Sequence, residues 1–203
     1  MALREEKKRA TRLAIADAAM GLFGAHGFDR VTVAEVADAA RVSINTVFNY
    51  FPTKEDLFFD RQAEVIDRLA GAVRQRAADE SPAAAVHRLF LDELRRDEPT
   101  LGLSAEATTF WQLVDASPAL QARLRLLGEQ TEAALAEAIT ESIGAGKRDA
   151  TPRVLAAALA GIDRALHAEI RHRLQSGDAP DAVRRDIRKA AGLFETMAGL
   201  GVQ

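Results

Sequence analysis

The residues from Val42 to Leu57, VSINTVFNYFPTKEDL, decide the fold of this chain. We interpret them as a short helix, a break at Pro52 and the beginning of a longer helix. Ser43 is a favourable N-cap, because its hydroxyl can accept a hydrogen bond from a backbone N–H of the first turn. Pro52 ends the short helix, since the residue before a proline is disfavoured in the α conformation. Thr53 and Asp56 then form a capping-box pattern that starts the next helix.

The short helix has an apolar face and a polar face. Its apolar residues recur at i, i+3, i+4 and i+7, so we expect them to pack inward: Ile44, Val47, Phe48 and Phe51. The outward face then carries Asn45, Thr46, Asn49 and Tyr50. Uncharged hydrogen-bonding side chains of this kind read base edges in the major groove of DNA. Lys54 opens the next helix, where a DNA phosphate can be held.

The residues before this stretch complete a helix-turn-helix. Thr32 and Glu35 form a second capping box, which predicts a short helix whose apolar face includes Val36. Ala40, Arg41 and Val42 then make a three-residue turn into Ser43, as a helix-turn-helix requires.

The first 60 residues or so resemble the tetracycline repressor (TetR) family of bacterial transcriptional regulators. The matching residues are Ile15, Leu22, Phe23, Gly27, Phe28, Thr32, Val36, Ala37, Ala40, Val42, Ser43, Thr46, Tyr50, Phe51, Lys54 and Leu57. Two positions depart from the family pattern. Arg41 stands where the family commonly has Gly in the turn, and Phe48 stands where Tyr is frequent. Because a non-glycine residue in the left-handed conformation costs about 1–2 kcal/mol, we expect Arg41 either to strain the turn or to shift its angle.

The resemblance implies an all-α protein with a helix-turn-helix DNA-binding domain at residues 1–52 and a helical ligand-binding and dimerisation domain at 53–203. It implies a homodimer that binds a palindromic operator as a repressor. A small-molecule effector in the body would tilt the helix that starts at Thr53 and release the DNA. The candidate DNA-binding residues are Thr32, Ser43, Asn45, Thr46, Asn49, Tyr50 and Lys54.

Composition excludes several other classes of protein. The chain has no cysteine, which excludes disulfides and thiolate metal sites. No apolar run approaches the roughly 18 residues of a membrane span, and the charged N-terminus lacks the apolar core of a signal peptide. We therefore expect a cytoplasmic protein. The net charge is −3, yet residues 1–54 carry eight Lys or Arg against six Asp or Glu. A slightly basic head on an acidic body suits a protein that touches DNA at one end. The basic residues at positions 4–12 are either a solvated first helical turn or an arm lying against DNA.

Helical periodicity and Ser-Pro or Thr-Pro starts predict about nine helices. The predicted helices beyond the helix-turn-helix cover residues 53–77, 81–96, 104–115, 117–142, 151–177 and 180–197. No strand-like alternation appears. Two motifs that would indicate chemistry fail on inspection. His167 and His172 are five residues apart and lie on different helical faces, and Gly144–Lys147 lacks the first glycine and the hydroxyl residue of a phosphate loop. We expect no metal, no cofactor and no enzymatic activity.

Two sets of residues in the body have two interpretations each. The first set contains polar residues inside or at the edge of apolar stripes, with aromatic residues as further candidates. They are either satisfied core groups or local ion pairs, or they form the wall of an effector cavity: His87, Phe90, Phe110, Trp111, Thr131, Asp163 and His167. The last two long helices carry more apolar positions than one covering layer needs, and these are either core or a dimer interface: Leu159, Ile162, Leu166, Ile187, Phe194 and Met197. The alternative functions are a DNA-binding regulator without ligand control, and a helical small-molecule-binding protein or enzyme.

Overall fold

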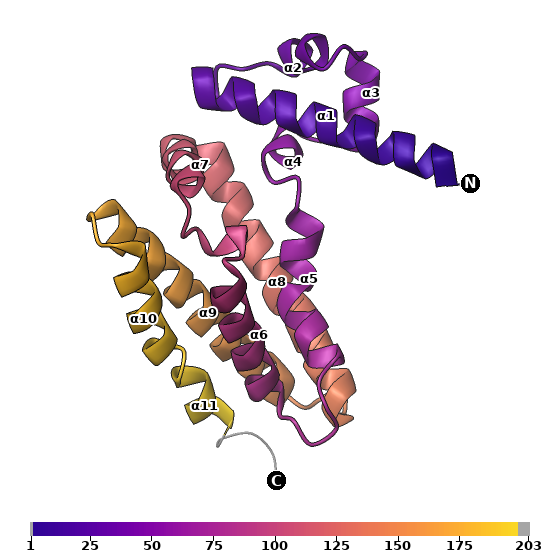
Figure 1. The fold of residues 1–203 in the computed structure, drawn as a ribbon. Coiled ribbons are helices and arrows are strands. Elements are labelled where there is room, and N and C mark those ends of the chain that lie inside the picture. Colours follow the sequence, from indigo (N-terminus) through magenta and orange to yellow (C-terminus); the bar gives the residue numbers. More distant parts are fainter. Residues whose placement is uncertain (1, 199–203) are drawn as a thin grey trace. The chain divides into compact units, whose positions relative to one another are not determined.

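The computed structural model describes residues 2–198, and the regular structure in that range is entirely helical (Figure 1). The helices are α1 (Ala2–His26), α2 (Val33–Ala39), α3 (Ile44–Tyr50), α4 (Lys54–Phe58), α5 (Gln62–Arg74), α6 (Pro82–Arg96), the 3₁₀ turn η1 (Pro99–Leu101), α7 (Ala105–Ala116), α8 (Pro118–Ile143), α9 (Thr151–Gln175), α10 (Pro180–Ala190) and α11 (Leu193–Ala198). The all-α prediction is confirmed.

Two of the predicted helices are each broken into two, so the described residues form eleven α-helices where about nine were predicted. The helix predicted from Thr53 to Ala77 breaks at Phe59, whose backbone leaves the α region at φ −98° and ψ 52°. Phe58 and Phe59, on the two sides of this break, are both buried. The last predicted helix is interrupted between Ala190 and Leu193, a stretch that contains Gly192.

The chain divides into two compact units. One unit contains residues 1–63 and 109–124, and the other contains residues 64–108 and 125–203. We call them unit 1 and unit 2. The helix-turn-helix predicted at residues 1–52 lies within unit 1, which also includes α4, most of α7 and the beginning of α8. The division into domains at residue 52 stays a prediction.

Unit 1 has an aromatic core. The rings of Phe23 and Phe28 lie 5.0 Å apart, and Phe58 packs against both at 6.1 and 5.9 Å. Phe110 of α7 stacks on Phe58 at 4.7 Å between centroids. Such pairs add about 0.5–1.5 kcal/mol each beyond the area they bury. Phe110 therefore joins α7 to the hydrophobic core of the N-terminal helices.

A buried carboxylate also joins α8 to unit 1. Asp56 Oδ1 accepts hydrogen bonds from Arg123 at 2.5 Å and Gln62 at 2.8 Å, while Oδ2 accepts the backbone N–H of Thr53 at 2.9 Å. Burial alone would raise the pKa of Asp56, but the hydrogen bonds from Gln62 and Thr53 and the charge of Arg123 hold it below its usual value. The capping box predicted at Thr53 is confirmed. Its carboxylate, that of Asp56, also binds Arg123 of α8.

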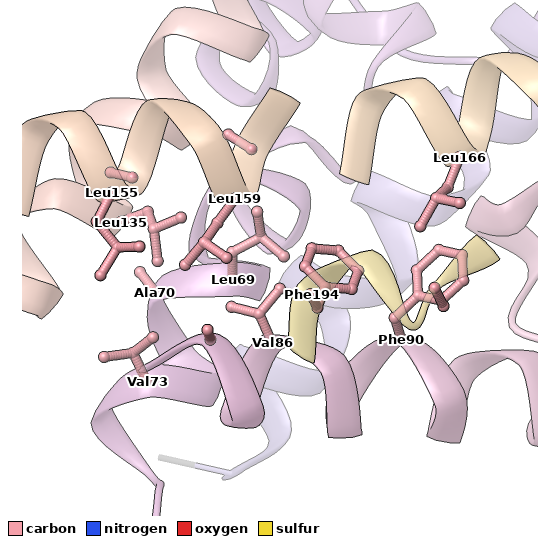
Figure 2. Close-up of a cluster of buried hydrophobic side chains, with 14 of the residues drawn as sticks. Leu69, Ala70, Val73, Val86, Phe90, Leu135, Leu155, Leu159, Leu166 and Phe194 are labelled. Carbon is pink, nitrogen blue, oxygen red and sulfur yellow. The ribbon is translucent and has the colours of Figure 1, made fainter. Parts of the chain in front are cut away.

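Unit 2 is organised around an apolar cluster to which α5, α6, α8, α9, α10 and α11 all contribute. Figure 2 shows Phe90 of α6 and Phe194 of α11 near Leu166 and Leu159 of α9. The rings of Phe90 and Phe194 lie 6.1 Å apart and both side chains are fully buried. Removing such a side chain costs about 3–5 kcal/mol of stability, so this cluster holds the helices of unit 2 together.

A group of charged side chains is buried beside the same cluster. Arg68 of α5 bridges Glu93 of α6 and Asp163 of α9. Burial would lower the pKa of Arg68, but the charges of Asp163 and Glu93 raise it, whereas burial raises the pKa of Glu93 itself. His167 Nδ1 lies 2.8 Å from the Asp163 carbonyl oxygen, and burial lowers the pKa of His167. Asp163 Oδ1 is buried without a hydrogen-bond partner.

The turn between α2 and α3 is a Schellman motif. The N–H of Val42 donates to Ala37 at 2.9 Å and the N–H of Arg41 donates to Asp38 at 3.1 Å, as the motif requires. Arg41 occupies the left-handed position with φ 56°, where glycine is usual. The sequence-based expectation of a strained turn is consistent with this φ.

We predict that Arg41→Gly stabilises the chain by about 1 kcal/mol, because glycine adopts positive φ without the steric cost that a Cβ incurs. Chemical denaturation of both proteins would measure the difference. Arg30→Gly is the matched control, since Arg30 is also an exposed turn residue but does not have a positive φ. If Arg30→Gly is stabilised as much as Arg41→Gly, or if Arg41→Gly is destabilised, the backbone at Arg41 is not strained.

Candidate functional site

Helix α3 is held at its beginning by the predicted cap. Ser43 Oγ accepts the backbone N–H of Thr46 at 3.1 Å, and the two hydroxyls lie 2.8 Å apart. Thr32 caps α2 in the same way, with the Glu35 N–H at 3.2 Å and the reciprocal bond from its own N–H to the Glu35 carboxylate at 2.7 Å. The hydroxyls of Thr32 and Ser43 are therefore used to position α2 and α3.

The apolar face of α3 is narrower than predicted. Val47 and Phe51 are buried, but Ile44 is 45 % exposed and Phe48 is 46 % exposed, so the prediction that all four pack inward was wrong for these two. The helix has only seven residues and is covered on the Val47 side, which leaves its remaining surface to solvent. Asn45 and Asn49 are exposed as predicted, while Thr46 and Tyr50 are half-buried.

Arg12 of α1 anchors the end of α3. Its guanidinium donates to the carbonyl oxygen of Tyr50 at 3.1 Å and to that of Asp60 at 2.7 Å, and it lies 4.2 Å from the ring centroid of Phe51. The Tyr50 carbonyl belongs to the last turn of α3, which has free acceptors. Sequence reasoning missed this role. Arg12 sits in a basic run, and its partners are 38 and 48 residues away in the chain.

The side chain of Lys54 lies against Phe28, in the turn that follows α1. Its ammonium is 4.3 Å from the ring centroid of Phe28, and burial lowers its pKa. A cation–π contact of this kind contributes about 0.5–1 kcal/mol at an exposed site and fixes the direction of a flexible side chain. Lys54 is therefore a positioned cation at the first residue of α4.

The predicted ligand-binding residues divide between the two units. Phe110 and Trp111 belong to unit 1, where their rings meet edge-on at 5.2 Å. His87, Phe90, Thr131, Asp163 and His167 belong to unit 2. Within unit 2, His167 packs edge-on against Phe90 at 5.9 Å and contacts Asp163. The Thr131 hydroxyl donates to the Leu127 carbonyl of its own helix.

One of these residues, His87, lines a groove on unit 2. The groove has a volume of about 620 Å³ and lies among residues of α6, α10 and α11, including Leu91, Arg188 and Glu195. His87 Nδ1 is 3.4 Å from a carboxylate oxygen of Glu195, and its ring lies 6.1 Å from that of Phe194. A volume of this size is within the range of small-molecule sites.

Four of the six predicted dimer-interface residues are buried within a single chain. Leu159, Leu166, Ile187 and Phe194 belong to the core of unit 2, whereas Ile162 and Met197 are half-buried. Helical periodicity identified an apolar face of α9 correctly but could not tell which partner covers it. The other face of α9 carries Val154, Ala157, Gly161, Ala165 and Ala168, which are exposed except for the half-buried Gly161. A dimer interface on α9 stays a prediction.

Among residues 2–198, no helix is long and apolar enough to cross a lipid bilayer. The same residues contain no cluster of three or more His, Asp or Glu side chains that is arranged to bind a metal ion.

Comparison with known proteins identifies both parts of the chain. Residues 15–60 match the family model for bacterial regulatory proteins of the TetR family, and residues 80–194 match the model for the MftR C-terminal domain. The HTH-type transcriptional regulator TcmR of Streptomyces glaucescens is 29 % identical over 171 residues, which cover 82 % of this chain and 76 % of TcmR.

Solved structures share the fold. NalD, the secondary repressor of the MexAB-OprM multidrug efflux pump in Pseudomonas aeruginosa, aligns with a TM-score of 0.57 at 18 % identity over 90 % of this chain and 96 % of its own. The transcriptional regulator FadR of Bacillus subtilis, solved in complex with stearoyl-CoA, aligns with a TM-score of 0.52 at 17 % identity over 88 % of this chain and 96 % of its own. With the capped helix-turn-helix, the all-helical body and both family models in agreement, this chain belongs to the TetR family of DNA-binding transcriptional regulators.

Proposed function

We propose that the chain is a repressor that binds a palindromic operator as a homodimer and is released by a small-molecule effector. The observation that carries the proposal is the exposed, uncharged face of α3, with Asn45 and Asn49 one turn apart on it. The Ser43 cap at one end and Arg12 at the other fix this helix in unit 1. In a helix-turn-helix protein such a helix enters the major groove, and a twofold partner contacts a second half-site about 34–36 Å away.

Selection of bound duplexes from random DNA tests the proposal directly. We expect one recovered sequence class with two inverted half-sites, whose centres are about one helical turn or a multiple of it apart. If no sequence class is recovered, the chain does not bind a specific operator. A single half-site without an inverted repeat would remove the dimer.

Substitutions in α3 and α4 separate base contacts from phosphate contacts. Asn49→Ala should weaken binding to the selected operator and relax the preference at one position, by about 1–3 kcal/mol for a bidentate contact. Lys54→Ala should weaken binding to all sequences and reduce the salt slope by about one. Fluorescence anisotropy at several salt concentrations measures both effects.

Lys147→Ala is the matched control for Lys54, because Lys147 is an exposed lysine of unit 2. It should bind DNA as the wild type does. If Asn49→Ala and Lys54→Ala also bind as the wild type does, α3 and α4 are not the DNA-binding surface.

The proposed dimer would use the small-residue stripe of α9, defined as Val154, Ala157, Gly161, Ala165 and Ala168. These positions are spaced by three, four, four and three residues and therefore share one face of the helix. Val154 is 67 % exposed and Leu193 at the beginning of α11 is 56 % exposed, which are large values for aliphatic side chains. Small side chains allow two helices to approach closely, and a self-complementary face suits a twofold axis.

We predict that Ala165→Glu converts the dimer into a monomer, because it brings two like charges together where the stripe would be desolvated. Ala165 is exposed in the single chain, so the fold of each subunit should be retained. Light scattering gives the mass, and circular dichroism checks the fold. Ala133→Glu, at an exposed position of α8, should remain a dimer. An Ala165→Glu protein of dimer mass would place the interface elsewhere.

The proposed effector would bind in unit 2, where the groove beside His87 combines apolar and charged walls. Leu91 and the His87 ring offer apolar surface, and charged side chains of both signs line the same groove: Arg88, Arg95, Arg188, Asp92 and Glu195. The fold neighbour FadR of Bacillus subtilis was solved with stearoyl-CoA, so that compound belongs in a first panel of probes. An effector acts by its unequal affinity for DNA-competent and DNA-incompetent conformations.

We predict that a true effector lowers operator affinity about 5- to 150-fold, and that operator DNA lowers effector affinity by the same factor. Calorimetry with and without operator measures the reciprocity. His87→Gln should weaken the effector and leave DNA binding unchanged without it. His172→Gln, an exposed histidine of α9, is the control and should have no effect. Normal effector affinity in His87→Gln would exclude the groove as the effector site. If no tested compound shows reciprocal coupling with the operator, a regulator without ligand control is favoured.

A further inference from the structure

The exposed face of α3 combines two amides with two apolar side chains and carries no charge. The helix sequence, INTVFNY, contains no Lys, Arg, Asp or Glu. Ile44 and Phe48 are one turn apart, and so are Asn45 and Asn49. The two pairs therefore form neighbouring rows along one exposed side of the helix, while Val47 is fully buried on the other side.

The exposure of Ile44 and Phe48 is unusual within this chain. Only six large hydrophobic side chains in the described residues are highly exposed, and two of them lie on this seven-residue helix. Single exposed apolar residues need no explanation, but a pair on the face that is proposed to contact DNA implies an apolar partner there. The thymine methyl group is the apolar group that DNA presents in the major groove.

We propose that α3 reads A·T base pairs through both of their major-groove groups, with Asn45 and Asn49 at adenine and with Ile44 and Phe48 at the thymine methyl. An asparagine amide can form two hydrogen bonds with adenine N6 and N7, and an apolar side chain can contact the C5 methyl of the paired thymine. Guanine is most often bound by Arg or Lys, and α3 has neither. The inference rests on the proposed entry of α3 into the major groove and names the bases that it recognises there.

Replacement of thymine by deoxyuridine tests the methyl contact, because it removes only the methyl group and keeps the base pairing. In the operator recovered by selection, each thymine of one half-site is replaced in turn. We expect one or two replacements to lower wild-type affinity about fourfold each, the factor that burying one methyl-sized apolar group supplies.

Variants of α3 assign the contact to a side chain. Phe48→Ala or Ile44→Ala should bind the thymine operator about as weakly as the wild type binds the deoxyuridine operator, and should lose the difference between the two duplexes. Phe48→Leu keeps an apolar side chain and should retain part of the difference. Leu126→Ala removes a similarly exposed aliphatic side chain from α8 and should behave as the wild type on both duplexes. Thermal unfolding checks that each variant is folded.

The outcomes separate this inference from the proposed function. If no sequence class is recovered, the proposed function fails and the inference falls with it. If an operator is recovered but no deoxyuridine replacement changes affinity, only the methyl contact is overturned. The same conclusion follows if Phe48→Ala and Ile44→Ala both keep the wild-type preference for thymine. A half-site made only of G·C pairs would overturn adenine recognition by Asn45 and Asn49.

Discussion

The geometry of unit 1 depends on the contacts that the guanidinium of Arg12 makes. The guanidinium reaches the last turn of α3 through the Tyr50 carbonyl and the break after α4 through the Asp60 carbonyl, and it lies over the Phe51 ring. A seven-residue helix is too short to be stable by itself, so α3 exists because its ends and its buried face are held. The Ser43 cap holds the first end and Arg12 holds the other. An Arg at this position is useful because its planar group can donate to two carbonyls at once.

In both units, buried carboxylates bind an arginine of another helix. Asp56 receives hydrogen bonds from three side-chain or backbone groups in unit 1, and its low pKa follows from them. In unit 2, Glu93 and Asp163 share Arg68, and burial raises the pKa of Glu93. Replacing a buried ion pair by apolar residues is often neutral, but removing one partner costs about 3–5 kcal/mol. Each of these buried groups therefore depends on its partners, and the Arg68 group links α5, α6 and α9.

Local features of the chain were predictable, and contacts between distant segments were not. The caps at Thr32, Ser43 and Thr53 were all confirmed, because a cap depends on residues two or three positions apart. Periodicity found the apolar faces of α3 and α9 but not what covers them. Ile44 and Phe48 are therefore exposed, and Leu159 and Phe194 are core residues. Arg12 could not be distinguished from its basic neighbours, because its partners are set by the folded chain.

The distribution of charge in unit 1 separates affinity for DNA from selectivity. Because α3 has no cation, it cannot neutralise phosphates, and the salt-dependent part of binding has to come from other elements. Under the proposed function, Lys54 of α4 and the exposed Arg4, Lys7, Lys8 and Arg9 of α1 supply these cations. Arg12 is not available for this purpose, since its guanidinium already holds α3. Under the proposed function, removing charge from α1 or α4 weakens binding to every sequence, whereas changes on the exposed face of α3 alter which sequence is preferred.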